Sequence, residues 1–379
     1  MCGIVGYTGN HDAKRALLNG LRRLEYRGYD SAGIALLDGD SLALARRVGK
    51  VENLSKAAGS LKIKSKTSCN GIAHTRWATH GAPTENNAHP HLSQSGKIAV
   101  VHNGIIENYQ SLRKRLIDSG YVFKSETDSE TLPHLIEKFH DGDLLSAVAA
   151  ALSQIEGTFG IAVISADHPD QIVTARRGSP IVIGVGDGET IVASDVTAIV
   201  GHTDKVIYLE DNDIALVTPE DVDIRTLDNV PITRDINRVD WDLSTVEKSG
   251  YDHFMLKEIF EQPEAIKNAI RGRLDHDLGT GILSGLNMQP GDMTNINRIV
   301  IAACGTSMHA GMVARYYFED LASILTDVEQ AAELRYRNPI LDGNTLVIPI
   351  SQSGETADTL AALREAKLKG SKVAAICNV

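Results

Sequence analysis

The chain has 379 residues, a length that indicates two domains, each with its own hydrophobic core. Its formal net charge of −11 argues against a general affinity for nucleic acid or an anionic membrane surface, and no apolar run is long enough to span a bilayer. The four cysteines lie far apart, so they predict neither a disulfide framework nor a zinc cluster and suit a reducing cytoplasm.

The N-terminal part, up to about residue 234, predicts an α+β domain with two antiparallel sheets. Short apolar runs predict the strands, and apolar residues three or four apart predict the helices. The predicted strands are residues 3–7, 34–37, 42–45, 70–74, 98–102, 159–164, 172–175, 181–185, 190–193 and 206–209. The predicted helices are residues 13–24, one carrying Tyr109, Leu112 and Leu116, one opening at residues 127–130 with capping-box spacing, and residues 144–152.

Two of these strands, 70–74 and 98–102, are predicted to run into polar loops that contain glycine. The first loop covers residues 76–91, and the second is Asn103-Gly104. Functional side chains concentrate in such loops because the rigid strands position them.

A different pattern begins after residue 234. Residues 235–250 are polar and aperiodic and predict a linker, and an amphipathic helix follows at 254–270. Apolar runs at 299–303, 346–350 and 373–377 predict strands of a parallel sheet with intervening helices. The expected organisation is a domain at residues 2–240, a linker and connecting helix at 241–285, and a partial α/β domain at 286–379.

Cys2 becomes the N-terminal residue if Met1 is removed, and its thiol and free amine then belong to one residue. An α-amine with a pKa of about 7.7–8.0 can take the proton of a thiol with a pKa of about 8.5. Taken alone, Met-Cys is merely how a reading frame begins, so a nucleophilic role depends on motifs elsewhere in the chain.

Five motifs in order resemble the class II glutamine amidotransferases. They are residues 1–6 (MCGIVG), 24–33 (LEYRGYDSAG), 74–81 (HTRWATHG), 102–104 (HNG) and 125–130 (SETDSE). With the second domain, the resemblance narrows to the family of isomerizing glutamine:fructose-6-phosphate aminotransferases and covers essentially the whole chain. It implies the αββα fold of N-terminal-nucleophile hydrolases, followed by a partial three-layer αβα sugar isomerase (SIS) domain with a parallel sheet.

The resemblance implies roles for the residues of the first domain. Cys2 would attack the amide carbon of glutamine to give a γ-glutamyl thioester and ammonia, and Asn103 and Gly104 would stabilise the oxyanion. Without this context, Asn-Gly after a strand is an ordinary turn. The residues implied to bind glutamine are Arg76 for its carboxylate, Asp128 for its ammonium, and Thr79 and His80 in the same loop as Arg76.

Several of these residues have alternative interpretations. Asp128 is also a carboxylate in the first turn of a predicted helix, where the helix dipole favours it. Trp77 resembles the gate of the family's ammonia channel, or it is a core anchor. Arg27 is a positive neighbour of the active site, or a solvated arginine at a helix end. The histidines at 74, 80, 89, 91 and 102 suggest a metal site, but no carboxylate or cysteine accompanies them at a recognised spacing, so with the amidotransferase resemblance no metal site is expected. The function that the resemblance implies needs no metal or organic cofactor.

In the second domain, a hydroxyl-rich turn follows each of the strands 299–303 and 346–350. Hydroxyls and N–H groups at helix N-termini bind phosphate without a net positive charge. Capping of the helices by serine and threonine is the alternative. By resemblance, the residues that hold the phosphate of fructose 6-phosphate are Thr306, Ser307, Ser351, Gln352, Ser353 and Thr356.

The predicted function is transfer of the amide nitrogen of L-glutamine to D-fructose 6-phosphate by a cytoplasmic enzyme that is a homodimer at full length. Family members continue into a second SIS subdomain, so the chain is expected to be a fragment with a glutaminase and half of an isomerase. The alternatives are an amidotransferase with another acceptor, as in asparagine synthetases or phosphoribosyl-diphosphate amidotransferases, and a non-catalytic module that binds a sugar phosphate.

Overall fold

The computed structural model describes residues 2–61, 63, 69–77, 81–239, 250–275, 279–281, 286, 290–352, 354 and 356–377. The chain divides into two compact units, Met1–Glu258 and Ile259–Val379. This division falls within residues 241–285, where the sequence predicts a linker and a connecting helix. None of the helices in the described part of the chain is both long and apolar enough to cross a bilayer.

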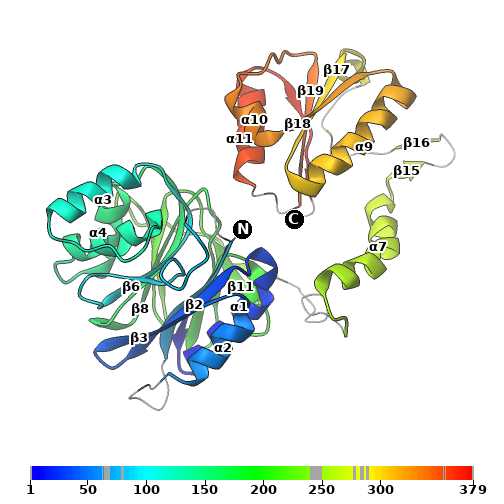
Figure 1. The fold of residues 1–379 in the computed structure, drawn as a ribbon. Helices are drawn as coiled ribbons and strands as arrows, with labels where there is room; N and C mark the ends of the chain where they lie inside the picture. The colour runs from blue at the N-terminus through cyan, green and yellow to red at the C-terminus, as the bar shows by residue number, and fades with distance from the viewer. Residues whose placement is uncertain are drawn as a thin grey trace. The chain divides into compact units, whose positions relative to one another are not determined.

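Two antiparallel sheets form the centre of the first unit (Figure 1). The larger sheet has the order β14 (Asn237–Arg238), β11 (Lys205–Tyr208), β9 (Val182–Val185), β10 (Glu189–Ala193), β1 (Gly3–Gly9), β4 (Asn70–Arg76), β2 (Ser31–Asp38) and β3 (Ser41–Val48). The smaller sheet has the order β13 (Val222–Thr226), β12 (Asp213–Val217), β8 (His168–Arg177), β7 (Gly157–Ser165), β6 (Ile98–Ile106) and β5 (His91–Leu92).

Helices cover the outer face of each sheet, which gives the predicted αββα order of layers. The larger sheet packs against α1 (Ala13–Arg23) and α2 (Val51–Gly59). The smaller sheet packs against α3 (Tyr109–Asp118), α4 (Thr131–Phe139) and α5 (Leu144–Leu152). The described residues of this unit also form the short 3-10 helices η1 (Glu25–Arg27), η2 (Asp128–Glu130) and η3 (Val196–Ala198).

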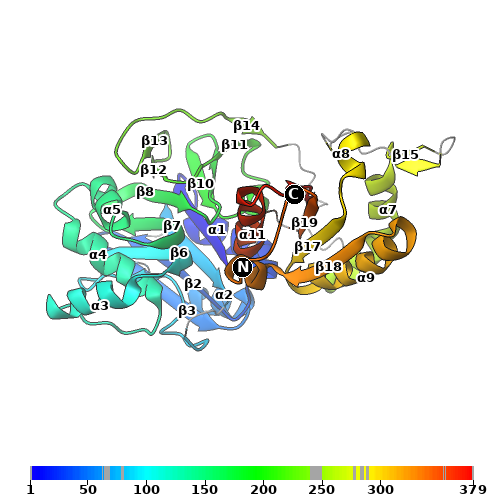
Figure 2. The same cartoon turned by 90° about the horizontal axis from the view of Figure 1, so that it is seen from above.

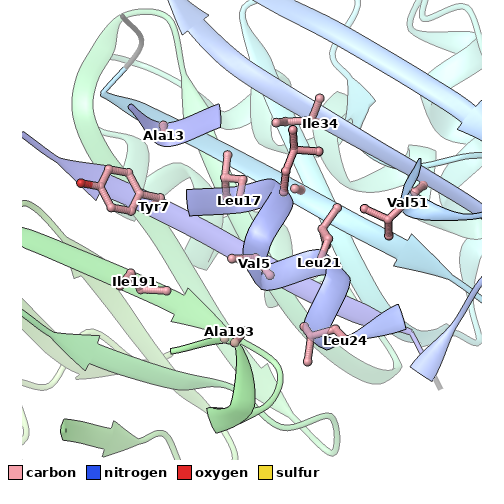
Figure 3. Packing of buried hydrophobic residues seen from close by; sticks show 14 of the residues in the cluster. Val5, Tyr7, Ala13, Leu17, Leu21, Leu24, Ile34, Val51, Ile191 and Ala193 are labelled. Carbon is pink, nitrogen blue, oxygen red and sulfur yellow. The ribbon is translucent and has the colours of Figure 1, made fainter. Parts of the chain in front are cut away.

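Strand β1 contributes to two cores because successive side chains of a strand point to opposite faces. Ile4 lies between the two sheets, whereas Val5 faces α1. On that helix, Leu17 and Leu21 are fully buried and pack beside Val5 (Figure 3), and each such burial contributes about 2 kcal/mol. The side chain of Asp12 accepts the Lys14 N–H and caps the start of the helix.

The second unit contains the predicted parallel sheet between layers of helices. Its five strands, all paired in parallel, are β18 (Leu325–Gln330), β17 (Arg298–Ala303), β19 (Thr345–Ser351), β20 (Lys372–Val373) and β21 (Ile376–Cys377). Helix α9 (Gly305–Ala322) packs on one face, and α10 (Ala331–Tyr336) and α11 (Ala357–Leu368) pack on the other (Figure 2). Preceding this sheet in the chain are α7 (Phe254–Ile270), β15 (Leu274–Asp275), β16 (Thr280–Gly281) and α8 (Pro290–Thr294).

Three local predictions are wrong. Asn103-Gly104 is not in a loop but inside β6, because the pairing with β7 continues to the end of the strand. No capping box forms at residues 127–130, because the carboxylate of Glu130 accepts the N–H groups of Lys124 and Ser125 instead. The strand expected at 373–377 is two short strands, β20 and β21, which both pair with β19.

Candidate active site

Cys2 directly precedes β1, whose neighbours in the sheet are β4 and β10. Its Sγ accepts the backbone N–H of Trp77 at 3.2 Å and lies 3.6 Å from the Trp77 carbonyl oxygen. Burial raises the pKa of the Cys2 thiol, while the Trp77 N–H and the positive charges of the terminal amine, Arg76 and Arg27 act to lower it. The effect of burial is the largest, so the pKa of the thiol is raised overall, and the Trp77 N–H and the three positive charges offset part of that rise.

Asn103 brings the second sheet to Cys2. Its Nδ2 donates to the Cys2 carbonyl oxygen at 3.1 Å, and its Oδ1 lies 2.9 Å from Nε2 of His74. The next residue, Gly104, has a φ of +138°, and a Cβ there would lie 2.1 Å from the carbonyl oxygen of Thr158. Only glycine fits this position, so the close approach of the two strands depends on it.

Arg76 and Asp128 are both buried beside this centre. The guanidinium of Arg76 donates to the carbonyl oxygens of Gly81 and Ala82, each at 3.3 Å. Burial lowers the pKa of Arg76, and the negative charges of Cys2, Asp128 and Asp30 act to raise it. These charges interact with Arg76, so the structure brings the predicted nucleophile and both predicted glutamine-binding charges into one neighbourhood.

The carboxylate of Asp128 is tied to β6. Its Oδ2 accepts the backbone N–H of Ile106 at 2.8 Å, and the side chain is 5% exposed. Asp128 also opens η2, so its position in a first helical turn is observed as well. Thr79 and His80, the other residues expected to bind glutamine, lie outside the described residues.

The structure excludes a solvated position for Arg27 and a core position for Trp77. Arg27 is not a solvated arginine, because its buried guanidinium donates to the Ser194 carbonyl oxygen at 2.8 Å and pairs with Asp195 at 3.0 Å. Trp77 is not a core anchor, because 44% of it is exposed. Its ring makes an edge-to-face contact with Tyr29 at a centroid distance of 5.5 Å.

Four of the five noted histidines are buried and lie together, and one of them, His74, contacts Asn103. The ring of His74 stacks on that of His89 at 4.2 Å, and His91 contacts His89 at 4.6 Å. Burial lowers the pKa of His74 and of His91 to about 3, so both rings are neutral at pH 7. Within the described residues, no group of histidine, cysteine, aspartate and glutamate side chains is arranged to hold a metal ion.

In the second unit, the two hydroxyl-rich turns are neighbours. Strands β17 and β19 are adjacent and parallel, with Ala303 opposite Ile350, so residues 304–307 and 351–356 follow the same edge of the sheet. The helices begin after Cys304 and Thr356, and neither side chain accepts a helix N–H. Among the described residues, a side chain at the N-cap position therefore caps neither helix.

The hydroxyl groups at this edge occupy different environments. Thr306 and Gln352 are exposed, and Ser307 is half-buried. The side-chain oxygens of Ser351 and Thr356 lie 3.2 Å apart. Ser353 lies outside the part of the chain that the structure describes.

Two residues of the site were not predicted from the sequence. Asp195 pairs with Arg27, and the Oγ of Ser194 accepts the backbone N–H of Ile4 at 3.0 Å. Both follow β10, and only the pairing of β10 with β1 brings them to Cys2. A serine and an aspartate after an apolar strand form too common a pattern to indicate this role.

Two family models match the chain. A glutamine amidotransferase domain matches residues 74–201, and a SIS domain matches residues 292–379. The isomerizing glutamine–fructose-6-phosphate aminotransferase of Chlorobaculum tepidum is 51% identical over 386 aligned positions, which cover 100% of this chain and 62% of the relative. The chain is a homologue of this aminotransferase. An enzyme of the same name from Thermus thermophilus is 48% identical, again over 100% of the chain.

The similarity to the curated aminotransferases covers part of their length. The chain spans about 62% of the length of the curated aminotransferases that it matches. Among solved structures, glutamine phosphoribosylpyrophosphate amidotransferase from B. subtilis matches 100% of this chain and 81% of its own, with a TM-score of 0.53 and 20% identity. That likeness concerns the fold alone, whereas the identity to the aminotransferases confirms the resemblance carried by the five motifs.

Proposed function

We propose that the whole protein transfers the amide nitrogen of L-glutamine to D-fructose 6-phosphate, giving D-glucosamine 6-phosphate and L-glutamate. The observation that carries the proposal is the setting of Cys2, held by the Trp77 N–H at its sulfur and by the Asn103 amide at its carbonyl. Relatives that are 51% and 48% identical are named for this reaction.

The reaction begins with glutamine hydrolysis at Cys2. With Met1 removed, the α-amine of Cys2 takes the thiol proton, and the thiolate attacks the amide carbon of glutamine. The C–N bond breaks, ammonia leaves with a proton returned by the same amine, and a γ-glutamyl thioester remains. Water then attacks the thioester, which releases glutamate and restores the thiol.

The negative oxygen of the tetrahedral intermediate is bound by Asn103 and Gly104. One N–H of Asn103 Nδ2 is used by the Cys2 carbonyl, and its second N–H is the donor for the oxyanion. The backbone N–H of Gly104 is the other donor. Loss of one such donor lowers kcat by about 10²–10³-fold in other enzymes of this type.

Glutamine is recognised through its charged groups. Arg76 binds the α-carboxylate, Asp128 binds the α-ammonium, and Thr79 and His80 complete the site. Burial of both charged side chains supports these roles because charge-assisted hydrogen bonds strengthen away from water. Trp77, exposed beside the thiol, acts as the gate for ammonia.

Fructose 6-phosphate binds at the carboxyl edge of the parallel sheet in the second unit. Its phosphate is held by the hydroxyl and N–H groups of Thr306, Ser307, Ser351, Gln352, Ser353 and Thr356. The adjacency of the two turns at one edge supports this site. By resemblance alone, we further propose that the full-length protein is a homodimer of the cytoplasm.

Mass spectrometry and a glutaminase assay test the role of Cys2. The purified chain is expected to lack Met1, to release ammonia from glutamine, and to gain the mass of an electrophilic glutamine analogue at Cys2. Cys2→Ala removes the nucleophile and is expected to abolish both ammonia release and labelling, with an unchanged unfolding curve. Equal ammonia release by Cys2→Ala and the unaltered chain contradicts the proposal.

Ligand-induced stabilisation tests the sugar-phosphate site. Fructose 6-phosphate is expected to raise the unfolding temperature of the chain, because a ligand that binds only the folded state stabilises it. Fructose without phosphate is the control ligand and is expected to have no effect. Ser307→Ala and Thr356→Val should each reduce the shift, and an equal shift with fructose would exclude phosphate recognition.

A further inference from the structure

The side-chain amide of Asn103 can be placed in two ways that have nearly the same shape. A half-turn about its last side-chain bond exchanges Oδ1 and Nδ2, and only Nδ2 can donate to an oxyanion. Whatever holds the amide in one orientation therefore decides whether the donor faces Cys2.

Two contacts select the orientation. The Cys2 carbonyl oxygen can only accept, so Nδ2 must face it, as observed at 3.1 Å. Oδ1 then faces His74, whose Nε2 lies 2.9 Å away and must carry the proton of this hydrogen bond. His74 thus donates to the end of the amide that is remote from Cys2.

His74 is itself held on several sides. On β4 it pairs with Ile4 of β1 and with Gly33 of β2, and the side chain is 1% exposed. Its ring stacks on His89 with an interplanar angle of 23°. His89 Nδ1 in turn accepts the backbone N–H of His102 at 3.2 Å, which ties the stacked pair to β6.

The ring also keeps one protonation state. Burial, with smaller effects from the charges of His102 and Arg76, lowers the pKa of His74 to about 3 despite the hydrogen bond to Asn103. The neutral ring therefore donates from Nε2 throughout the pH range in which a thiolate nucleophile works.

We propose that His74 is a positioning residue for the oxyanion donor: it fixes the Asn103 amide with Nδ2 toward Cys2. The proposal rests on the proposed glutaminase function. His74 touches neither glutamine nor the thiol in this role and acts only through Asn103. Its loss should therefore lower kcat and leave the binding of glutamine nearly unchanged.

Two substitutions at this position separate the donor from the bulk of the ring. His74→Met fills a similar volume without a donor, and His74→Gln retains an N–H near the position of Nε2. We expect His74→Met to lower the kcat of glutamine hydrolysis by about 10–100-fold, somewhat less than complete loss of an oxyanion donor. His74→Gln should recover most of that loss, and KM should change less than about threefold in both.

A double-mutant cycle distinguishes a positioning role of His74 from a merely structural one. Asn103→Ala removes the amide, so His74→Met in that background should cause little further loss of kcat. Alkylation of Cys2 by iodoacetamide forms no oxyanion and should proceed at the same rate in every variant. Unfolding curves confirm that each variant is folded.

The positioning role and the glutaminase function would fail in different ways. Multiplicative losses in the double variant, equal defects in His74→Gln and His74→Met, or a change confined to KM would overturn the positioning role while the chain remains a glutaminase. Ammonia release by the unaltered chain no faster than by Cys2→Ala would instead refute the proposed function, and the role of His74 with it.

Discussion

Asp128 illustrates how one side chain serves both the fold and the proposed site. Its Oδ2 accepts the Ile106 N–H at the end of β6, and the carboxylate charge acts on Arg76. An asparagine retains an acceptor oxygen for the first contact but lacks the charge for the second. The two roles can therefore be separated by a single substitution.

Asp128→Asn is expected to raise the KM for glutamine by about 10–100-fold, because a hydrogen bond to a charged group contributes about 1.5–3 kcal/mol. The thermal unfolding temperature should change little. Glutaramate, which is glutamine without its α-ammonium, is the matched substrate: the unaltered chain and Asp128→Asn should hydrolyse it equally slowly. A defect of the same size with both substrates would show that Asp128 does not bind the ammonium.

The ion pair of Arg27 and Asp195 gives a second prediction about a single residue. Asp195→Ala leaves a buried guanidinium without its carboxylate and is expected to lower the free energy of unfolding by about 2–3 kcal/mol, since Asp195 is partly exposed. Tyr26→Phe removes only a 2.7 Å hydrogen bond to the same carboxylate and should cost about 1 kcal/mol. Urea unfolding of both variants measures the difference, and equal losses would mean that the charge contributes nothing.

At the scale of helices and strands, sequence reasoning succeeded where one face of an element is continuously apolar. Helices α5 and α7 begin and end at the predicted residues. The sequence analysis missed β13 and β18, which lie at sheet edges and carry polar residues such as Asp223 and Asp327. It also missed α2, although Val51, Leu54 and Ala58 have helical spacing and are buried.

The candidate site was predictable in its residues but not in its contacts. The family motifs indicate Cys2, Asn103 and Asp128 individually, since each belongs to a short local pattern. The hydrogen bond of His74 to Asn103 joins β4 of one sheet to β6 of the other, and no local pattern encodes that packing. The stacking of His74 on His89 likewise depends on the path of the chain after β4.

Gly33 allows the chain to take this path after β4. Its substitution therefore gives a prediction about how a strand packs against that segment. A Cβ on Gly33 would lie 2.0 Å from the His89 carbonyl oxygen, so Gly33→Ala must displace the segment that holds His89. We expect a loss of about 1–3 kcal/mol in stability and a lower kcat for glutamine hydrolysis. Gly59→Ala is the control, because no atom lies within 4 Å of its added Cβ. Unchanged stability in Gly33→Ala would show that the segment moves at no cost.

At the scale of the whole molecule, the buried histidines make the first unit sensitive to acid. His74 and His91 have pKa values lowered to about 3 in the folded chain, and about 6.5 is the ordinary value for an unfolded histidine. Burial acts to raise the pKa of the Glu130 carboxyl, but the His134 ring 3.8 Å away and hydrogen bonds from Lys124 and Ser125 outweigh it and lower this pKa to about 2. The contribution of Glu130 to the stability of the folded chain is present above a pH of about 4.5 and is lost only below that value.

Stability should therefore fall between pH 7 and pH 5, before the carboxylates titrate. In this range the unfolded histidines bind protons and the folded ones do not, so unfolding is favoured as the pH drops. A pH of 5 is about 1.5 units below the pKa of an unfolded histidine. The free energy of unfolding should therefore be lower at pH 5 by roughly 2 kcal/mol for each of His74 and His91. Urea unfolding at pH 7, 6 and 5 measures the slope.

The matched variant is His91→Gln, which can still contact the Thr127 hydroxyl that lies 3.0 Å from Nε2 of His91. This variant has one proton-binding group fewer in the unfolded chain. Between pH 7 and pH 5 it should therefore lose roughly 2 kcal/mol less stability than the unaltered chain loses. A decline of the same size in both proteins would place the acid sensitivity elsewhere. No decline in the unaltered chain would mean that the histidines are protonated in the folded state, which would also remove the fixed tautomer on which the role of His74 depends.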